Sequence, residues 1–185
     1  MPPSIPRPWD AFLADLDQAL EEPVELRCIG GFVVSLLYGI GRPTADVDVL
    51  EVRPPAVRAQ LGQLAGPQTA LHKKHKVYLQ QVAVLGAYPE DYATRLTEMF
   101  PGALGRLRLL ALDPYDLALT KLERNSSRDR EDVFHLGRSI PLDTAVLRKR
   151  YEDEMRPILG NPAREDLTLR LWIAAIEEGR SKDGS

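Results

Sequence analysis

Two carboxylates at alternate positions are the residues of this sequence best placed to do chemistry. Asp46 and Asp48 alternate with Val47 and Val49 in an otherwise apolar run. Because side chains of a β-strand point alternately to its two faces, we expect both carboxylates on one face and both valines in the core. Two carboxylates on one face favour a hard divalent cation between them. The run therefore predicts a strand that holds Mg²⁺ at Asp46 and Asp48.

A Gly-Gly pair precedes these carboxylates, at the change from an apolar strand to an apolar helix. Gly30 and Gly31 have no side chains to keep a phosphate from the backbone, and their N–H groups begin a helix, where anions are favoured. Arg42 and Thr44 follow in a turn rich in glycine and proline. Each feature alone is common, but the combination predicts a site for a nucleoside triphosphate. A solvated loop arginine and a turn-capping hydroxyl are the alternatives for Arg42 and Thr44.

A second charged block lies further along the chain. Lys121 and Arg124 are one turn apart on an expected helix, and Arg128, Asp129 and Asp132 belong to the next one. A lysine on a helix is usually solvated, so the residues alone assign Lys121 no ligand. Salt bridges within the block, such as one between Arg128 and Asp132, are an equal alternative for these residues.

The pattern Gly-Gly, helix, Arg-x-Thr-x-Asp-x-Asp resembles the polymerase-beta-type nucleotidyltransferase superfamily. The similarity is greatest to the AbiEii and MenT-type toxins of bacterial toxin–antitoxin systems, whose later Lys and Arg-Asp-x-x-Asp motifs resemble the second block. It covers roughly residues 24–136. The resemblance implies the nucleotidyltransferase fold, of α/β (α+β) class, in which a small mixed sheet has flanking helices and a C-terminal helical part.

The resemblance also implies an activity. A toxin of this kind transfers a nucleoside monophosphate from a nucleoside triphosphate to a hydroxyl of a tRNA or a protein, uses Mg²⁺, and has a cognate antitoxin protein as a partner. The residues expected to act in catalysis are Asp46, Asp48, Lys121, Asp129 and Asp132, with the metal on Asp46 and Asp48. The residues expected to bind substrate are Gly30, Gly31, Arg42, Thr44, Arg124 and Arg128.

One departure from the superfamily concerns its third carboxylate, which typically lies on a strand beside the Asp-x-Asp pair. The corresponding strand, expected over residues 77–85, carries Gln80 and Gln81 and no acid. An amide can coordinate a cation but cannot act as a base. The sequence offers four acids that could replace the missing one: Glu90, Asp91, Asp129 and Asp132.

This departure keeps other functions open. A non-catalytic pseudo-nucleotidyltransferase, which binds a nucleotide or a partner, is the first alternative, and an antibiotic-modifying nucleotidyltransferase is the second. The absence of the third acid favours the former. The joint presence of Asp46, Asp48 and Lys121 favours an enzyme.

Composition limits the function classes further. The 185 residues, 44% of them apolar, suffice for a well-buried domain, and the net charge of −3 gives no overall attraction to nucleic acid. The basic run at 72–76 could grip RNA phosphates, but a mobile, solvated hairpin is the slightly preferred interpretation. The single Cys28 lies in an apolar strand and is expected to be a buried structural thiol. No long apolar run or signal-type start is present, so we expect a cytoplasmic protein without membrane contact.

The expected organisation is one domain with a helical extension. Residues 1–140 form the nucleotidyltransferase core, with residues 1–8 as a proline-rich surface arm. Residues 141–179 form C-terminal helices packed on the core, and 180–185 a disordered tail.

Overall fold

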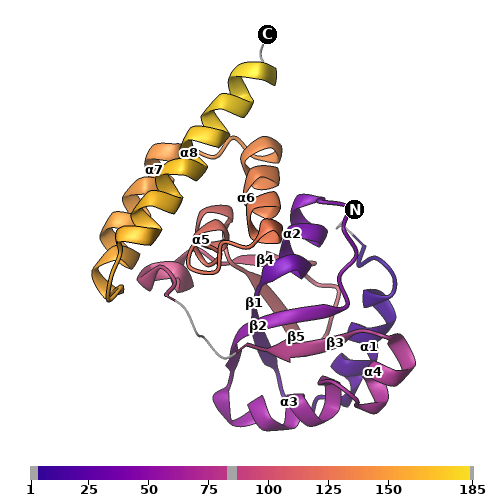
Figure 1. Cartoon of the computed structure of the whole chain (residues 1–185). Coiled ribbons are helices and arrows are strands. Elements are labelled where there is room, and N and C mark those ends of the chain that lie inside the picture. The colour runs from indigo at the N-terminus through magenta and orange to yellow at the C-terminus, as the bar shows by residue number, and fades with distance from the viewer. Residues whose placement is uncertain (1–3, 83–86, 184–185) are drawn as a thin grey trace. The chain divides into compact units, whose positions relative to one another are not determined.

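The computed structural model of the 185-residue chain describes residues 4–82 and 87–183 (Figure 1). Its contacts separate into two compact units. The first, here called the sheet unit, joins Met1–Ala83 with Leu96–Leu112, and the second, the helical unit, joins Val84–Arg95 with Asp113–Ser185. The main boundary thus falls at Asp113 and not near residue 140, because the helices after Asp113 make their contacts with the C-terminal helices.

Five strands form one mixed sheet in the order β3-β2-β1-β5-β4. The strands are β1 (Val24–Ile29), β2 (Asp46–Arg53), β3 (Tyr78–Gln81), β4 (Thr97–Met99) and β5 (Leu107–Ala111). β1 runs antiparallel to β2 and parallel to β5, β3 runs parallel to β2, and β4 runs antiparallel to β5. The expected fold class is confirmed, since this is the small mixed sheet with flanking helices of a nucleotidyltransferase fold. The short strand β4 was not predicted.

Helices of the sheet unit follow or precede these strands. They are α1 (Trp9–Ala19), α2 (Gly30–Tyr38), α3 (Arg58–Ala65, entered through a 3₁₀ turn at Pro55–Val57) and α4 (Ala70–His75). Helices α1, α3 and α4 contact one another. The buried face of α1 carries Phe12, Leu13 and Leu16, at the three- and four-residue spacing that predicted an amphipathic helix. The helix ends at Ala19.

The basic run at 72–76 is not the predicted hairpin. It forms helix α4, because Thr69 caps its start by accepting a hydrogen bond from the His72 N–H at 3.3 Å. Asp15 on α1 then anchors the helix, since its Oδ2 lies 2.6 Å from Lys74 Nζ and 2.7 Å from His75 Nε2. Lys76 ends the helix in the left-handed conformation, with φ of 65°.

The strand expected over residues 77–85 is shorter in the structure. β3 ends at Gln81, and residues 83–85 of the expected strand lie outside the described part of the chain. The described strand is nevertheless long enough to pair with β2 from Asp46 to Val49.

The helical unit contains a 3₁₀ helix η2 (Glu90–Thr94) and the helices α5 (Pro114–Leu119), α6 (Ser127–Ser139), α7 (Thr144–Arg150) and α8 (Ala163–Asp183). A π turn at Tyr151–Met155 and a 3₁₀ turn at Arg156–Ile158 extend α7. α8 packs on α6 and α7. It continues through residues 180–183, which were predicted to be a disordered tail.

Candidate nucleotide site

The two predicted metal ligands lie on one face of β2. Burial along the strand alternates, so that Asp46 and Asp48 are half-buried while Val47 and Val49 are fully buried. Val49 pairs with Gln81, whose side chain bonds to Arg58 at the start of α3. The valines therefore face the layer of α1, α3 and α4, and the carboxylates face the opposite side of the sheet.

The Gly-Gly turn meets one of these carboxylates directly. Asp48 pairs with Ile29, the last residue of β1, and Gly30 follows with φ of +75°. An ideal Cβ built on Gly30 would lie 3.0 Å from Cγ of Asp48 and would overlap its Oδ2. Glycine is required here for two independent reasons, because a side chain would be strained by the backbone and would also displace the carboxylate.

Thr44 and Gly31 complete this group. The Thr44 hydroxyl lies 3.0 Å from Oδ1 of Asp46, within hydrogen-bond distance, and so orients that carboxylate. A Cβ on Gly31 would meet the same hydroxyl at 3.8 Å, which is ordinary van der Waals contact. The Arg42 carbonyl accepts a hydrogen bond of 2.8 Å from Ser35 on α2, which fixes the turn before the carboxylates.

The strand register distinguishes Gln80 from Gln81, the two residues that stand where the superfamily has its third carboxylate. Asp48 pairs with Gln80 and Asp46 pairs with Tyr78 on the parallel strand β3. Paired residues of adjacent strands share a face, so the Gln80 amide lies on the side of the carboxylates. Gln81 points to the other side, where its Oε1 accepts from Arg58 Nε at 3.0 Å and its Nε2 donates to the Arg58 carbonyl at 2.6 Å.

The donor set on this face suits a hard cation. Carboxylate oxygens of Asp46 and Asp48, the Gln80 amide oxygen and the Thr44 hydroxyl are all oxygen donors of the kind that Mg²⁺ prefers. Over residues 4–82 and 87–183, no three His, Cys, Asp or Glu side chains are grouped so as to hold a metal ion. A cation at this site would thus depend on two carboxylates.

Cys28 is a structural thiol, as its apolar surroundings predicted. It is fully buried in β1. Burial raises the pKa of the Cys28 thiol far above its ordinary value, and the negative charge of nearby Asp48 raises it further. The thiol therefore stays protonated and is not a nucleophile.

The second predicted block forms an ion cluster in the helical unit. Lys121 is only 4% exposed, and its Nζ lies 2.7 Å from Oδ2 of Asp132 and 3.6 Å from Oδ1 of Asp129. Arg124 adds two hydrogen bonds of 2.7 and 2.6 Å to the Asp129 carboxylate. Asp129 also forms a capping box with Ser126 at the start of α6.

These contacts support the structural alternative for the block. Burial alone would raise the pKa of Asp129, but the hydrogen bonds from Arg124 and Ser126 and the charge of Lys121 bring it well below its usual range. Asp132 is paired with Lys121, whereas the sequence suggested a bond with Arg128. Arg128 itself is exposed on the first turn of α6.

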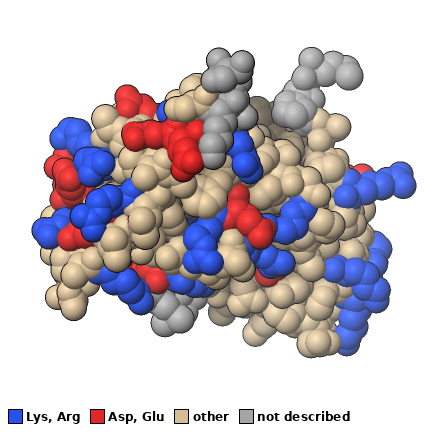
Figure 2. All heavy atoms as spheres, turned by 45° about the horizontal axis from the view of Figure 1, so that its top comes forward, with Lys and Arg blue, Asp and Glu red and all other residues tan. Residues whose placement is uncertain are grey.

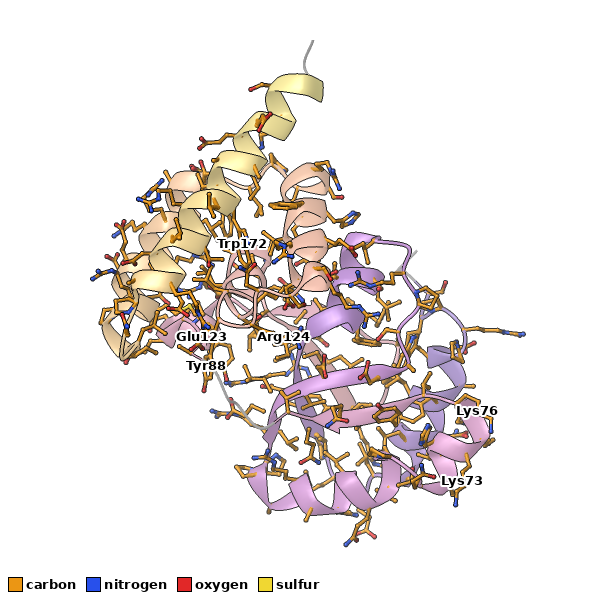
Figure 3. The ribbon with its side chains drawn as sticks, in the orientation of Figure 1. Lys73, Lys76, Tyr88, Glu123, Arg124 and Trp172 are labelled. Atoms are coloured by element: carbon orange, nitrogen blue, oxygen red, sulfur yellow. The ribbon has the colours of Figure 1, made fainter. Side chains whose placement is uncertain are left out.

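The structure thus gathers the predicted residues into two groups. Gly30, Gly31, Thr44, Asp46 and Asp48 meet in the sheet unit, with Arg42 in the turn beside them. Lys121, Arg124, Asp129 and Asp132 meet in the helical unit, where Figure 3 labels Arg124. Glu90 and Asp91, the other acids suggested for the third carboxylate, are exposed on η2 of the helical unit.

A buried charge network in the helical unit was not predicted. Asp116, with no exposed surface, accepts hydrogen bonds of 2.8 and 3.1 Å from Arg95 and one of 2.9 Å from Arg150. Burial raises the pKa of Asp116, and the charge of Asp113 adds to that rise against the opposing effect of Arg95 and Arg150. Only the packing of η2, α5 and α7 brings these charges together, so no local pattern could have identified them.

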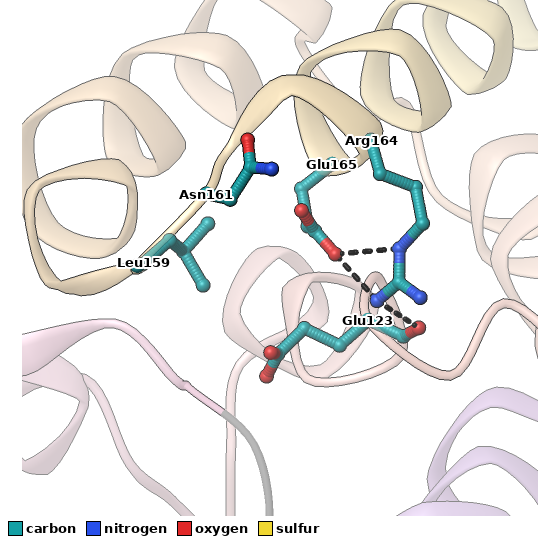
Figure 4. A pocket seen from close by; sticks show the side chains of 6 residues that line it. Glu123, Leu159, Asn161, Arg164 and Glu165 are labelled. Carbon is teal, nitrogen blue, oxygen red and sulfur yellow. Dashed lines mark hydrogen bonds and ion pairs between the residues drawn. The ribbon is translucent and has the colours of Figure 1, made fainter.

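The helical unit also contains an open pocket of about 330 Å³ (Figure 4). Its lining residues are Glu123, Leu159, Gly160, Asn161, Arg164 and Glu165. Arg164 donates to Oε1 of the buried Glu165 at 2.8 and 2.6 Å and to the Glu123 carbonyl at 3.0 Å. The Arg164 guanidinium is therefore already hydrogen-bonded to other residues that line the pocket.

The fold and the sheet-unit site together define a nucleotidyltransferase-type protein, with paired carboxylates on a mixed sheet beside a glycine turn. The chain belongs to the family described as "Nucleotidyltransferase of unknown function (DUF6036)", whose sequence model matches residues 10–178. No curated protein and no solved structure matches the chain significantly. Among the described helices, none has the length and apolar character needed to cross a membrane.

Proposed function

We propose that the protein is a metal-dependent nucleotidyltransferase that transfers a nucleoside monophosphate from a nucleoside triphosphate to a hydroxyl of a tRNA or a protein, as the toxin of a toxin–antitoxin system. The observation that supports the transfer proposal is the close approach of the Asp48 carboxylate to Gly30, since we propose that the former holds the metal and the latter begins the phosphate-binding turn. The resemblance to AbiEii and MenT-type toxins supports the toxin role and a cognate antitoxin as partner.

Each residue of the site has a part in this mechanism. Backbone N–H groups at Gly30 and Gly31 bind the triphosphate, and Arg42 lies in the turn beside them. Asp46 and Asp48 would hold Mg²⁺, and Thr44 orients Asp46 through its hydroxyl. When bound, Mg²⁺ stabilises the charge on the phosphates and promotes ionisation of the attacking hydroxyl.

Strand β3 provides no carboxylate to accept the proton of that hydroxyl, because the β3 residue that pairs with Asp48 is Gln80. Loss of a general base lowers a rate by about two to four decades. A slow enzyme is compatible with a toxin, but Gln80 equally favours the second candidate, a pseudo-nucleotidyltransferase that binds nucleotide without transfer.

Labelled nucleotide transfer separates the two candidates. The protein is incubated with each α-labelled nucleoside triphosphate, Mg²⁺, and total bacterial RNA and protein, beside the variant Asp46→Asn/Asp48→Asn and the control Asp10→Asn, which changes a partly exposed carboxylate of α1. We expect label on RNA or protein with the wild type and the control, and none with the double variant. Mg²⁺-dependent nucleotide binding by calorimetry without any label transfer would establish the pseudoenzyme instead.

Restoring an acid at the third position should accelerate transfer. Gln80→Glu places a carboxylate beside Asp48 on the same face, where it can take the acceptor's proton, and we expect a gain of up to about 10²-fold in the transfer rate. The matched control is Gln81→Glu, which adds the same charge to the opposite face and should give no gain. Equal rates for the two variants would show that Gln80 does not occupy the third-carboxylate position.

A further inference from the structure

An aromatic pair lies directly beside the carboxylates in the sheet unit. Tyr78 pairs with Asp46 across β2 and β3, and its N–H donates to the Ala45 carbonyl at 3.0 Å. The Tyr78 side chain leaves the strand on the face of Asp46, but β3 is the edge strand, and the half-exposed ring reaches past this edge to His72 of α4.

His72 of α4 supports this tyrosine. The two rings have centroids 4.8 Å apart and planes tilted by 50°. His72 Nδ1 accepts a hydrogen bond of 2.9 Å from the Gln68 N–H, which holds the imidazole in place. The pair thus forms a preorganised aromatic surface at the edge of the sheet.

Exposed positive charge stands on the same helix. Lys73 and Lys76 are exposed on α4 (Figure 3), and within the described chain neither has an ion-pair partner, whereas Lys74 is bound to Asp15. Lys76 keeps a left-handed backbone, with φ of 65°, at a position where glycine is the least strained residue. Elsewhere the charges are mixed, as the interspersed acidic and basic residues of Figure 2 show for the face it presents.

We infer that Tyr78, backed by His72, is the stacking surface for a base at a single-stranded end of an RNA acceptor, and that Lys73 and Lys76 bind its phosphates. This inference rests on the proposed transferase function. Aromatic faces beside lysines are the usual means of binding single-stranded nucleic acid, and they tolerate any base because every base has a π-face.

The strand order gives the direction of approach. Gly30 follows β1, the carboxylates lie on β2, and Tyr78 lies on β3, so the carboxylates stand between the glycine turn and the aromatic pair. The attacking hydroxyl must approach from the side opposite the departing pyrophosphate. With the triphosphate bound at the glycine turn, the side that remains open to the hydroxyl is that of β3. Tyr78 is thus placed for the acceptor and not for the base of the triphosphate.

RNA binding can be measured apart from transfer. Fluorescence anisotropy of a labelled 12-nucleotide single-stranded RNA of mixed sequence, without nucleotide, is compared for the wild type, Tyr78→Leu and Tyr78→Phe. We expect Tyr78→Leu to weaken binding by about fivefold to a hundredfold, and Tyr78→Phe, which retains the ring, to bind like the wild type. The matched control is Tyr88→Leu, which breaks the Tyr88–Tyr92 pair of the helical unit and should leave RNA binding unchanged.

Lys76→Gly tests the charge without straining the fold. Glycine suits the left-handed backbone, so we expect an unchanged or higher unfolding temperature together with a smaller dependence of RNA affinity on salt, by a slope of about 1. The inference is overturned if the wild type does not bind RNA, or if Tyr78→Leu and Tyr88→Leu weaken RNA binding equally. It is also overturned if label is transferred to protein and Tyr78→Leu leaves that transfer intact. If RNA binds through Tyr78 while no label moves, the RNA-binding surface is confirmed, but its acceptor role fails together with the proposed transfer.

Discussion

Gly30→Ala is expected to abolish most nucleotide transfer and to destabilise the sheet unit. A methyl group at residue 30 overlaps Oδ2 of Asp48, and alanine is strained at the φ of +75°. The strain costs about 1–2 kcal/mol and the steric overlap a further 1–3 kcal/mol. If Asp48 holds the metal as proposed, displacing its carboxylate by about 1 Å costs transfer on the order of 10²-fold. Urea unfolding and labelled transfer measure the two effects.

Alanine substitutions at two other glycines separate the effect of backbone strain from that of the steric overlap. Gly41→Ala introduces alanine at a φ of +65° with nothing within 4 Å of the new Cβ, so it should show the backbone strain alone, about 1–2 kcal/mol, with transfer retained. Gly31→Ala meets only Thr44 Oγ1, at 3.8 Å, and should leave stability unchanged while weakening triphosphate binding. Equal losses of transfer in Gly30→Ala and Gly41→Ala would argue against a direct role of the Gly30–Asp48 contact.

Lys121→Met is expected to destabilise the helical unit by about 3–5 kcal/mol, because it removes the partner that lies 2.7 Å from the buried Asp132 carboxylate. The measurement is urea unfolding, with hydrogen exchange along α6 to locate the change. If Lys121 instead served mainly to bind nucleotide phosphate, Lys121→Met would lower nucleotide affinity and leave the unfolding midpoint unchanged.

Two controls accompany this variant. Lys121→Met/Asp132→Leu removes both charges and should recover much of the lost stability, since replacing both members of a buried pair by apolar residues is often neutral. Lys149→Met breaks an exposed pair with Asp153 in the same unit and should leave the unfolding midpoint unchanged. A double variant as unstable as Lys121→Met would show that the pair itself is not the source of the effect.

The buried cluster also predicts a pH dependence. The pKa of Asp129 is lower in the folded protein than in the unfolded chain, so its contribution to stability is complete above the unfolded carboxyl pKa of about 3.9 and is lost as the pH falls through the folded pKa.

Local patterns were sufficient for several features of this protein. The alternation of Asp46 and Asp48 with two valines placed both carboxylates on one face, because the two-residue period of a strand needs no knowledge of its neighbours. The Gly-Gly turn was likewise predictable, since it depends on the backbone within a few residues. The mixed sheet was predicted from the resemblance to the nucleotidyltransferase superfamily.

The tertiary structure alone decided which residues lie beside these carboxylates and beside Lys121. The register of β3 on β2 puts Gln80 next to Asp48 and Tyr78 next to Asp46, and that register is set by hydrogen bonds between segments far apart in the chain. The burial of Lys121 with Asp132 depends in the same way on the packing of separate helical segments. A sequence pattern specifies the chemistry a residue carries, but the residue's neighbours, and hence its role, depend on long-range packing.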